Sequence, residues 1–295
     1  MSTTALGRNK AVDLALYGLL SLFALATLLP FIYIVLVSFT SPSEYARTPI
    51  LLFPREWSTA SYDYIFRSGS FMRSMGVSGF LAIVGTACSL LVTSTLAYGL
   101  SRSRLKGRRV ILGGILFTML FNPGMIPAYM IVKEYGLMNS IWSLILPSLS
   151  SAFYVLLMKG FFQEIPAELE ESAKMDGSSD IGVFFRIIVP VSIPAIAAFG
   201  LFYGVGFWNT FFAGVMYITD DAKRPLQVVL QMMLLNASTG VGSGAAAQAL
   251  SVEQRLPPET LKMAAVIVSS LPIIAVYPFL QRYFVSGMML GSVKG

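Results

Sequence analysis

The sequence contains no histidine and a single cysteine among its 295 residues. The chain therefore lacks the commonest metal ligand and the side chain that most often acts as a general base near neutral pH. Cys88 lies inside an apolar run, so an intramolecular disulfide and a cysteine metal cluster are excluded. These absences argue against a membrane enzyme, and we expect neither catalytic residues nor a bound metal.

Charged residues are also scarce, at 12% of the chain against roughly 25% in soluble domains. The apolar runs are longer than β-barrel strands require, so we predict an all-α, polytopic membrane protein. A net charge of +6 is typical of a membrane protein with basic cytoplasmic loops. The sequence has neither a basic patch with interleaved aromatic residues nor a G-x-x-x-x-G-K-[ST] phosphate loop. Nucleic acid is therefore not an expected partner, and an ATP-driven protein of this kind would need ATP on another chain.

Six apolar segments are near or above the roughly 20 residues that cross a bilayer as a helix. The six predicted spans are 12–39, 72–100, 110–132, 141–162, 187–217 and 259–285. A short helix is expected around 59–66, and 218–258 is predicted to be the longest loop. We find no tandem repeat and no separate soluble domain, so 1–295 is expected to be one transmembrane domain.

The segment 101–109, SRSRLKGRR, has five basic residues and no acidic one. Because short loops rich in Lys and Arg stay in the cytoplasm, this loop sets the expected orientation. Both termini and the loop between spans 4 and 5 then lie on the cytoplasmic side. A re-entrant segment in place of span 3 would invert everything that follows it.

The segment 163–190 is the most polar part of the chain, and its charges exclude it from lipid. Pro166 is typical of a first helical turn, and Gly177 of a left-handed helix end. Ser178 or Ser179 can cap a second helix, so we predict a helical hairpin. Four of its residues have the spacing of one helix face: Leu169, Ser172, Ala173 and Asp176. Such a hairpin is either a docking surface for a soluble partner or a solvated loop with ordinary caps.

The spacing within this hairpin resembles the EAA loop of permease subunits of bacterial ATP-binding-cassette importers. Here it reads Glu171-Ser172-Ala173, then Gly177, then Ile187-Ile188-Val189-Pro190. Ser172 and Val189 depart conservatively from the Ala and Leu of the pattern. The ending QRYFVSGMMLGSVKG is similar to that of the carbohydrate-uptake, maltose-type oligosaccharide permeases, and the resemblance covers essentially the whole chain.

The resemblance implies a bacterial inner-membrane subunit that forms half of a translocation path with a second permease chain, expected to be a heterodimer. Two cytoplasmic ATPase subunits would hold ATP and Mg, with no cofactor on this chain, and an extracytoplasmic binding protein would deliver the substrate. The substrate would be a sugar or oligosaccharide, including fragments of acidic polysaccharides. Alternatives are an importer permease for another solute class, or an ATP-independent secondary transporter.

The resemblance also implies that the loop 163–186 contains a coupling helix seated on an ATPase subunit. For the tail 292–295 two alternatives stay open, a contact with the ATPase pair, as in related permeases, and a disordered end. The residues expected to carry the coupling are Glu168, Leu169, Glu171, Ser172, Ala173, Asp176, Gly177 and Pro190.

Sugars are commonly bound by aromatic rings and by amide groups, and such residues occur within two predicted spans. The candidates for the substrate path are Asn122, Tyr203, Phe207, Trp208 and Asn209. An alternative is that the aromatic rings pack between helices while the asparagines form interhelical hydrogen bonds. Lys133, Glu134 and the loop 218–258 would face outside, as contacts for a binding protein or as solvated loop.

Overall fold

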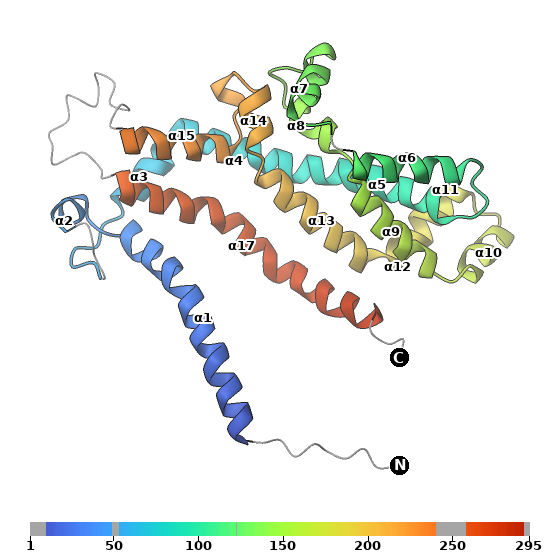
Figure 1. Ribbon diagram of the computed structural model, residues 1–295, viewed down its shortest axis with the longest axis horizontal. Coiled ribbons are helices and arrows are strands. Elements are labelled where there is room, and N and C mark those ends of the chain that lie inside the picture. Colours follow the sequence, from blue (N-terminus) through green and yellow to red (C-terminus); the bar gives the residue numbers. More distant parts are fainter. Residues whose placement is uncertain (1–9, 49–52, 122, 240–257, 292–295) are drawn as a thin grey trace. The chain divides into compact units, whose positions relative to one another are not determined.

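The computed structural model describes residues 10–48, 53–121, 123–239 and 258–291. Every extended regular element within these residues is a helix, as the sequence predicts (Figure 1). The chain divides into two units, Met1–Ser68 with Met232–Ser269 and Gly69–Gln231 with Ser270–Gly295. The fold is therefore all-α, and each unit is described below by itself.

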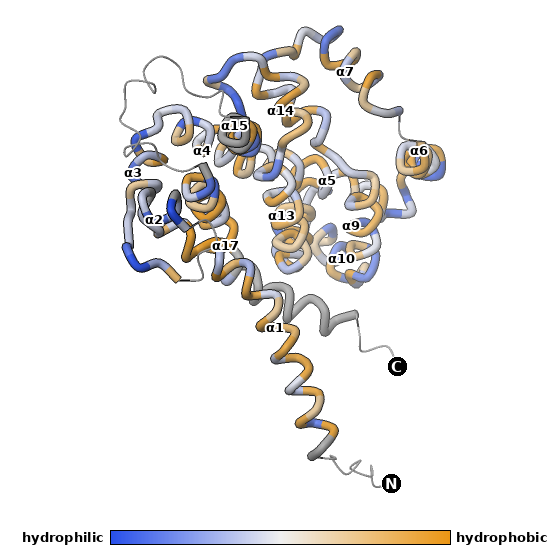
Figure 2. Tube along the Cα trace, turned by 60° about the vertical axis from the view of Figure 1, so that its left-hand side comes forward, coloured by the Kyte–Doolittle hydropathy of each residue, from blue (hydrophilic) through white to orange (hydrophobic). Residues whose placement is uncertain are grey.

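Three helical segments of the described chain are long and apolar enough to cross a bilayer alone: Val12–Ser38, Gly69–Ser101 and Glu259–Val276. Three further pairs of helices qualify when each bent pair is taken as one span. These pairs are Arg108–Leu120 with Met125–Glu134, Trp142–Ser148 with Ala152–Glu164, and Asp180–Val191 with Ile193–Trp208. Six spans result. Figure 2 shows many hydrophobic residues, in orange, along these helices.

The first unit begins with α1 (Lys10–Ser38), whose apolar side chains are mostly exposed, as lipid or another protein chain in the membrane would require. After α1, the chain turns into α2 (Pro42–Arg47) and α3 (Ala60–Arg67). The Ser38 hydroxyl lies 2.7 Å from that of Tyr62. The Glu44 carboxylate accepts hydrogen bonds from the backbone N–H groups of Arg55 and Glu56, so a compact polar turn follows the span.

The second unit is built around a second span that is continuous from α4 (Gly69–Phe80) through a π-helical turn, Leu81–Gly85, into α5 (Thr86–Ser101). Its core lies between α5, α9 (Ala152–Glu164) and α13 (Ile193–Trp208), three helices that run close together in Figure 1. Met158 and Phe162 of α9 are fully buried in this core. Further helices of the second unit are α6 (Arg108–Leu120), α7 (Met125–Glu134), α8 (Trp142–Ile145), α10 (Glu168–Met175), α11 (Asp180–Val183), α12 (Val189–Val191) and α14 (Phe212–Tyr217). The helices α15 (Leu226–Thr239) and α17 (Pro258–Gly291) each contribute residues to both units.

Gly85 lies at a close contact between the second and fifth spans of this unit. A Cβ atom built on Gly85 would lie 2.8 Å from the ring of Phe207, which is closer than real side chains allow. Small residues permit such close packing of membrane helices. Phe207 therefore fills the space that glycine leaves on the second span.

The structure differs from the sequence-based boundaries in several places. The predicted spans 110–132 and 141–162 are each a pair of helices, bent by 119° and 53°. The predicted span 187–217 is not one helix, because the axis turns by 83° at Ser192, after which α13 runs to Trp208 and α14 follows. Pro190 and Pro194 lack the N–H groups that a continuous helix needs on either side of that bend. Within the predicted loop 218–258, residues Leu226–Thr239 form the helix α15, and its first apolar side chains are buried. Residues 240–257 of that loop lie outside the described residues.

Candidate functional site at the coupling loop

The loop between spans 4 and 5 contains two helices, α10 (Glu168–Met175) and α11 (Asp180–Val183), as predicted from its helix-breaking residues. Gly177 ends α10 with φ of +81°, a conformation that glycine adopts without steric cost. The Ser178 N–H donates to the Ala173 carbonyl and the Gly177 N–H to the Lys174 carbonyl, which is a Schellman ending. Pro166 lies just before the cap residue Ala167 and two residues before Glu168, so it stands outside the first helical turn in which the sequence predicts it.

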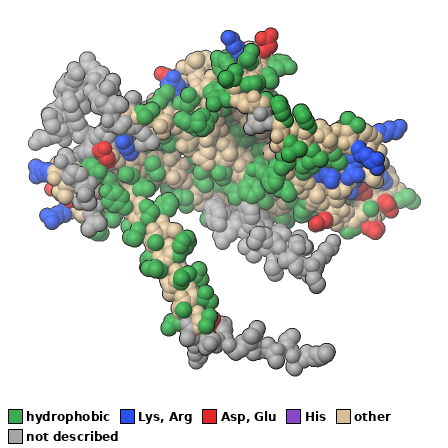
Figure 3. Space-filling view, in the orientation of Figure 1, with side chains coloured by type: hydrophobic (Ala, Val, Ile, Leu, Met, Phe, Trp, Pro, Cys, Tyr) green, Lys and Arg blue, Asp and Glu red, His purple; other side chains and the backbone are tan. Residues whose placement is uncertain are grey.

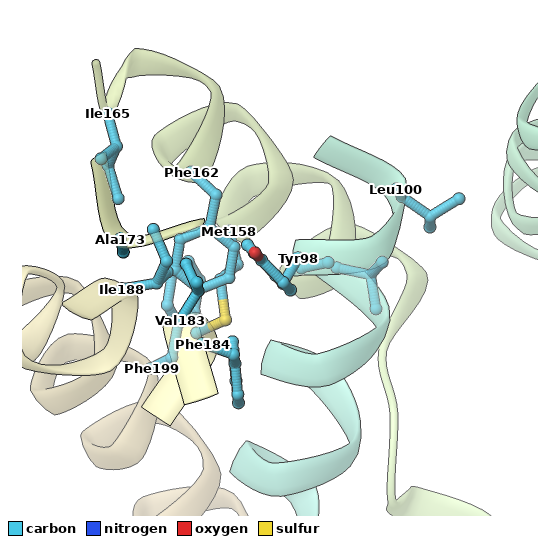
Figure 4. Packing of buried hydrophobic residues seen from close by; sticks show 12 residues of the cluster. Tyr98, Leu100, Met158, Phe162, Ile165, Ala173, Val183, Phe184, Ile188 and Phe199 are labelled. Carbon is cyan, nitrogen blue, oxygen red and sulfur yellow. The ribbon is translucent and has the colours of Figure 1, made fainter. Parts of the chain in front are cut away.

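The exposed face of α10 contains most of the residues expected to contact an ATPase subunit. Exposed side chains on α10 and at its end are Glu168, Leu169, Glu171, Ser172, Met175 and Asp176. Ala173 does not share this face, so the prediction of one outward face through Ala173 is wrong. Its methyl group is 7% exposed and packs into the core cluster with Met158 and Phe162 (Figure 4). The small residue thus permits close packing of α10 on its own chain.

Glu170, which the sequence analysis did not select, is the acidic residue of α10 that turns inward. Its side chain is 9% exposed, and its Oε1 lies 2.5 Å from Nη2 of Arg102. Arg102 follows α5 directly, and its guanidinium lies 5.0 Å from the centre of the Tyr98 ring. The basic run in 101–109 and the acidic run in 168–171 were a signal that the two loops could form an ion pair. The sequence alone does not say which acidic residue contacts Arg102.

Two further ion pairs lie at the surface, one between the segment 101–109 and the hairpin and one between α10 and α11 within the hairpin. The Asp180 carboxylate lies 2.6 Å from Nη2 of Arg104 and 3.1 Å from Nζ of Lys174. All three side chains are at least 31% exposed, so water weakens these interactions. Figure 3 shows blue and red side chains gathered at the end of the molecule that carries these helices. The basic segment 101–109 and the acidic hairpin therefore form one polar surface.

Pro190, the last of the predicted coupling residues, is exposed within α12, which continues from α11 through a π-helical turn. It lies two residues before the 83° bend at Ser192. The position of Pro190 therefore suits a corner between the loop and the fifth span, away from the exposed side chains of α10.

Three of the predicted substrate-path residues, Tyr203, Phe207 and Trp208, are buried within the chain. Tyr203 is 5% exposed, with its hydroxyl 2.7 Å from the Thr93 hydroxyl and accepting from the Ser151 N–H. Phe207 is 4% exposed and packs against Gly85. Of the two interpretations open from the sequence, burial favours packing between helices for these residues.

Trp208 and Asn209 lie at the end of α13 and differ in exposure. Trp208 is 6% exposed, and it lines an apolar groove of about 380 Å³ together with Thr86, Gly204 and Pro272. Asn209 is exposed, and its Oδ1 accepts a hydrogen bond from Gln227. Asn122 lies outside the described residues. The three aromatic rings are thus packed within the chain, and the exposed polar group is the amide of Asn209.

The loops at the other end of the second unit are joined by Asn139. This residue has φ of +59°, and its side-chain oxygen accepts from the N–H groups of Thr219 and Asp220. The Lys223 ammonium donates to the Asn139 carbonyl. Lys133 and Glu134, the candidates for contact with a binding protein, are exposed at the end of α7. These hydrogen bonds of Asn139 were not predicted, because an asparagine in a short turn has no distinctive sequence spacing.

Comparisons with known proteins agree with this geometry. Protein LplC of Bacillus subtilis (strain 168) is 47% identical over 270 residues, covering 91% of this chain and 90% of the relative. The polygalacturonan/rhamnogalacturonan transport system permease protein YtcP of the same organism is 43% identical over 290 residues, covering 98% and 100%. A chain from the crystal structure of a bacterial ABC transporter involved in the import of the acidic polysaccharide alginate aligns with a TM-score of 0.87. It is 29% identical, and the alignment covers 96% of this chain and all of that one.

A family model covers almost the entire chain, since residues 2–290 match the binding-protein-dependent transport system inner membrane component. This family consists of transport permeases, so the chain is a permease subunit and not an enzyme. The helical hairpin with its left-handed Gly177 and the six apolar spans fit such a permease. The chain belongs to the family of binding-protein-dependent transport system inner membrane components.

Proposed function

We propose that this chain forms one half of the translocation path of an ATP-driven importer, and that a cytoplasmic ATPase subunit docks on the exposed face of α10. The proposal rests on which side chains of α10 are buried and which are exposed. Its inner face is held by Ala173 and Glu170, while Leu169 and Ser172 remain exposed. A loop that was merely solvated would not need a buried ion pair behind it. Two ATPase subunits, holding ATP and Mg, would serve this chain and a second permease chain.

The proposed orientation has both termini, the segment 101–109 and the hairpin in the cytoplasm. The five basic residues of 101–109 support it, because such loops are retained on that side. The contacts of Arg102 and Arg104 with the hairpin support a common side for both loops. An extracytoplasmic binding protein would then approach the opposite end, where Lys133 and Glu134 are exposed.

The proposed substrate is an oligosaccharide, with fragments of acidic polysaccharides as the preferred class. The names of YtcP and of the alginate transporter support this class, since both proteins are described as transporting polysaccharides. Asn209 is the best-placed of the candidate residues for contact with the substrate, because its amide is exposed at the end of α13, while the buried ring of Trp208 lines the neighbouring groove.

The test is reconstitution of the chain in liposomes with its second permease, its ATPase and its binding protein. We expect ATP-dependent uptake of a labelled oligogalacturonate, little uptake of a neutral malto-oligosaccharide, and none without the binding protein. Uptake driven by an ion gradient without ATP would instead establish a secondary transporter. ATP-dependent uptake of the neutral sugar alone would refute the acidic substrate class.

A further inference from the structure

The coupling helix α10 is joined to the neighbouring helices by segments that interrupt the helical hydrogen-bond pattern. Residues 165–167, with Pro166, separate it from α9, and Gly177 separates it from α11. Force applied to α10 therefore does not pass along a continuous helix into either adjoining span. A side-chain contact with a span is needed if the direction of a displacement is to be preserved.

Arg102 and Glu170 provide such a contact with α5, the last part of the second span. Within the part of the chain that the structure describes, Glu170 is the one charged residue that is buried. Its carboxylate pairs with Arg102 at 2.5 Å. Arg102 in turn covers the ring of Tyr98, which packs 5.1 Å from the Phe184 ring and 6.4 Å from that of Phe162. The ion pair is thus anchored in the core of the unit.

The pair also fixes the rotation of α10 about its axis. Successive residues of an α-helix differ by about 100° around the axis, so residues two positions from Glu170 point to the opposite side. Those residues are Glu168 and Ser172, and both are exposed. The inward position of Glu170 therefore turns the docking face of α10 outward. Packing of the Ala173 methyl group alone would fix the rotation of the helix less strictly.

Stability alone does not explain a buried ion pair, because apolar residues of similar volume often serve equally well or better at such positions. A close ion pair differs from apolar packing because its energy depends on the separation of two particular groups. It therefore resists sliding of one helix over the other, which suits a contact that must carry displacement.

We propose that Arg102 and Glu170 are positioning residues that transmit movement of α10 to the second span. The inference rests on the proposed function, in which an ATPase subunit moves α10. Neither residue contacts substrate or ATP in this scheme. The exposed pair between Arg104 and Asp180 joins the same loops but, being solvated, contributes little to transmission.

The test uses the assembled importer in nanodiscs, with Arg102→Met/Glu170→Leu as the central variant. This change replaces the ion pair by apolar side chains without leaving one charge buried alone. We expect the ATPase subunits to co-purify with the variant, while the stimulation of ATP hydrolysis by the loaded binding protein falls about tenfold. The matched control, Arg104→Gln, should retain full stimulation.

A second measurement restores the contact chemically, which a purely structural role would not require. Arg102→Cys/Glu170→Cys is introduced into a Cys88→Ser chain, assembled with cysteine-free partner subunits, and treated with a short bifunctional thiol crosslinker. We expect stimulation to return with the crosslinker, and to stay low when a monofunctional reagent blocks the same thiols.

Wild-type stimulation in the Arg102→Met/Glu170→Leu variant would overturn the transmission role while leaving the proposed function intact. Failure of the crosslinker to restore stimulation in an assembled cysteine variant would also overturn it. If no ATPase subunit associates with the wild-type chain, the proposed function fails first, and the transmission role fails with it.

Discussion

Two loop regions at opposite ends of the second unit each place a residue in the left-handed conformation, but with different results. A Cβ atom built on Gly177 would meet no neighbouring atom within 4 Å, so the surface beside this turn stays open. At Asn139 the side chain itself binds the neighbouring loop through Thr219 and Asp220. The Asn139 turn, called here the closed end, is therefore held by side-chain contacts within the chain, and at the Gly177 turn, called the open end, no side chain fills the neighbouring space. The contrast indicates which of these two turns leaves room for a partner beside its backbone.

The largest expected effect comes from removal of the buried ion pair between Arg102 and Glu170, which lies behind the open end. Glu170→Ala leaves the Arg102 guanidinium largely buried without its partner, and we expect a loss of about 3 kcal/mol in the free energy of unfolding. The measurement is thermal unfolding of the purified chain in detergent. Arg104→Gln, which removes a solvated pair, should cost less than about 1 kcal/mol. Equal losses in the two variants would contradict the distinction between buried and exposed pairs.

The next effect concerns the closed end. Asn139→Ala removes the side-chain acceptor for two N–H groups and places alanine at φ of +59°, so we expect a loss of about 2 kcal/mol. Asn139→Gly removes the same acceptor but tolerates the backbone conformation. It should lose about 1 kcal/mol, and the difference between the variants measures backbone strain. Identical unfolding temperatures would show that strain does not contribute.

A smaller effect on stability is expected at the open end. Gly177→Val forces a β-branched residue into a left-handed conformation, at a cost of about 1–2 kcal/mol, while no neighbouring atom is displaced. Gly177→Asn should be nearly neutral, because asparagine tolerates this conformation. Membrane insertion should persist in both, whereas binding-protein-stimulated ATP hydrolysis should fall in Gly177→Val. Normal stimulation in that variant would count against docking at this turn.

The smallest change in stability is predicted for Ser172→Trp. Ser172 is exposed, so the unfolding free energy should change by less than about 0.5 kcal/mol. Co-purification of the ATPase subunit should nevertheless be lost, because the larger side chain stands on the proposed docking face. Glu164→Gln, an exposed change at the end of α9, is the matched control for association. Retained association in Ser172→Trp would place the ATPase elsewhere.

The sequence was sufficient to predict the helical hairpin, because the left-handed backbone conformation that ends α10 favours glycine, and Gly177 is the glycine at that point. It was also sufficient to predict the all-α membrane fold, since a long apolar run in lipid has few ways other than a helix to satisfy its backbone hydrogen bonds. The bend at Ser192 was missed because apolar composition continues unchanged through it. Helix α15 was missed because its apolar run is shorter than a span and was assigned to the loop.

The inward position of Glu170 was not predictable for a different reason. Helical spacing identifies which residues share a face, but several neighbouring acids leave the rotation of the helix undetermined. The choice depends on Arg102, which is distant in sequence and is brought to α10 by the packing of α5 in the core of the unit. Burial of Tyr203 depends likewise on its partners Thr93 and Ser151 from other parts of the chain.

The close approach of Phe207 to Gly85 has a consequence for the evolution of this chain. The two positions share a single volume, so neither can be enlarged alone. A lineage that gains a larger residue at position 85 should also acquire a smaller one at position 207, or widen the gap between the second and fifth spans. Substitutions at these distant sites should therefore arise as a compensated pair.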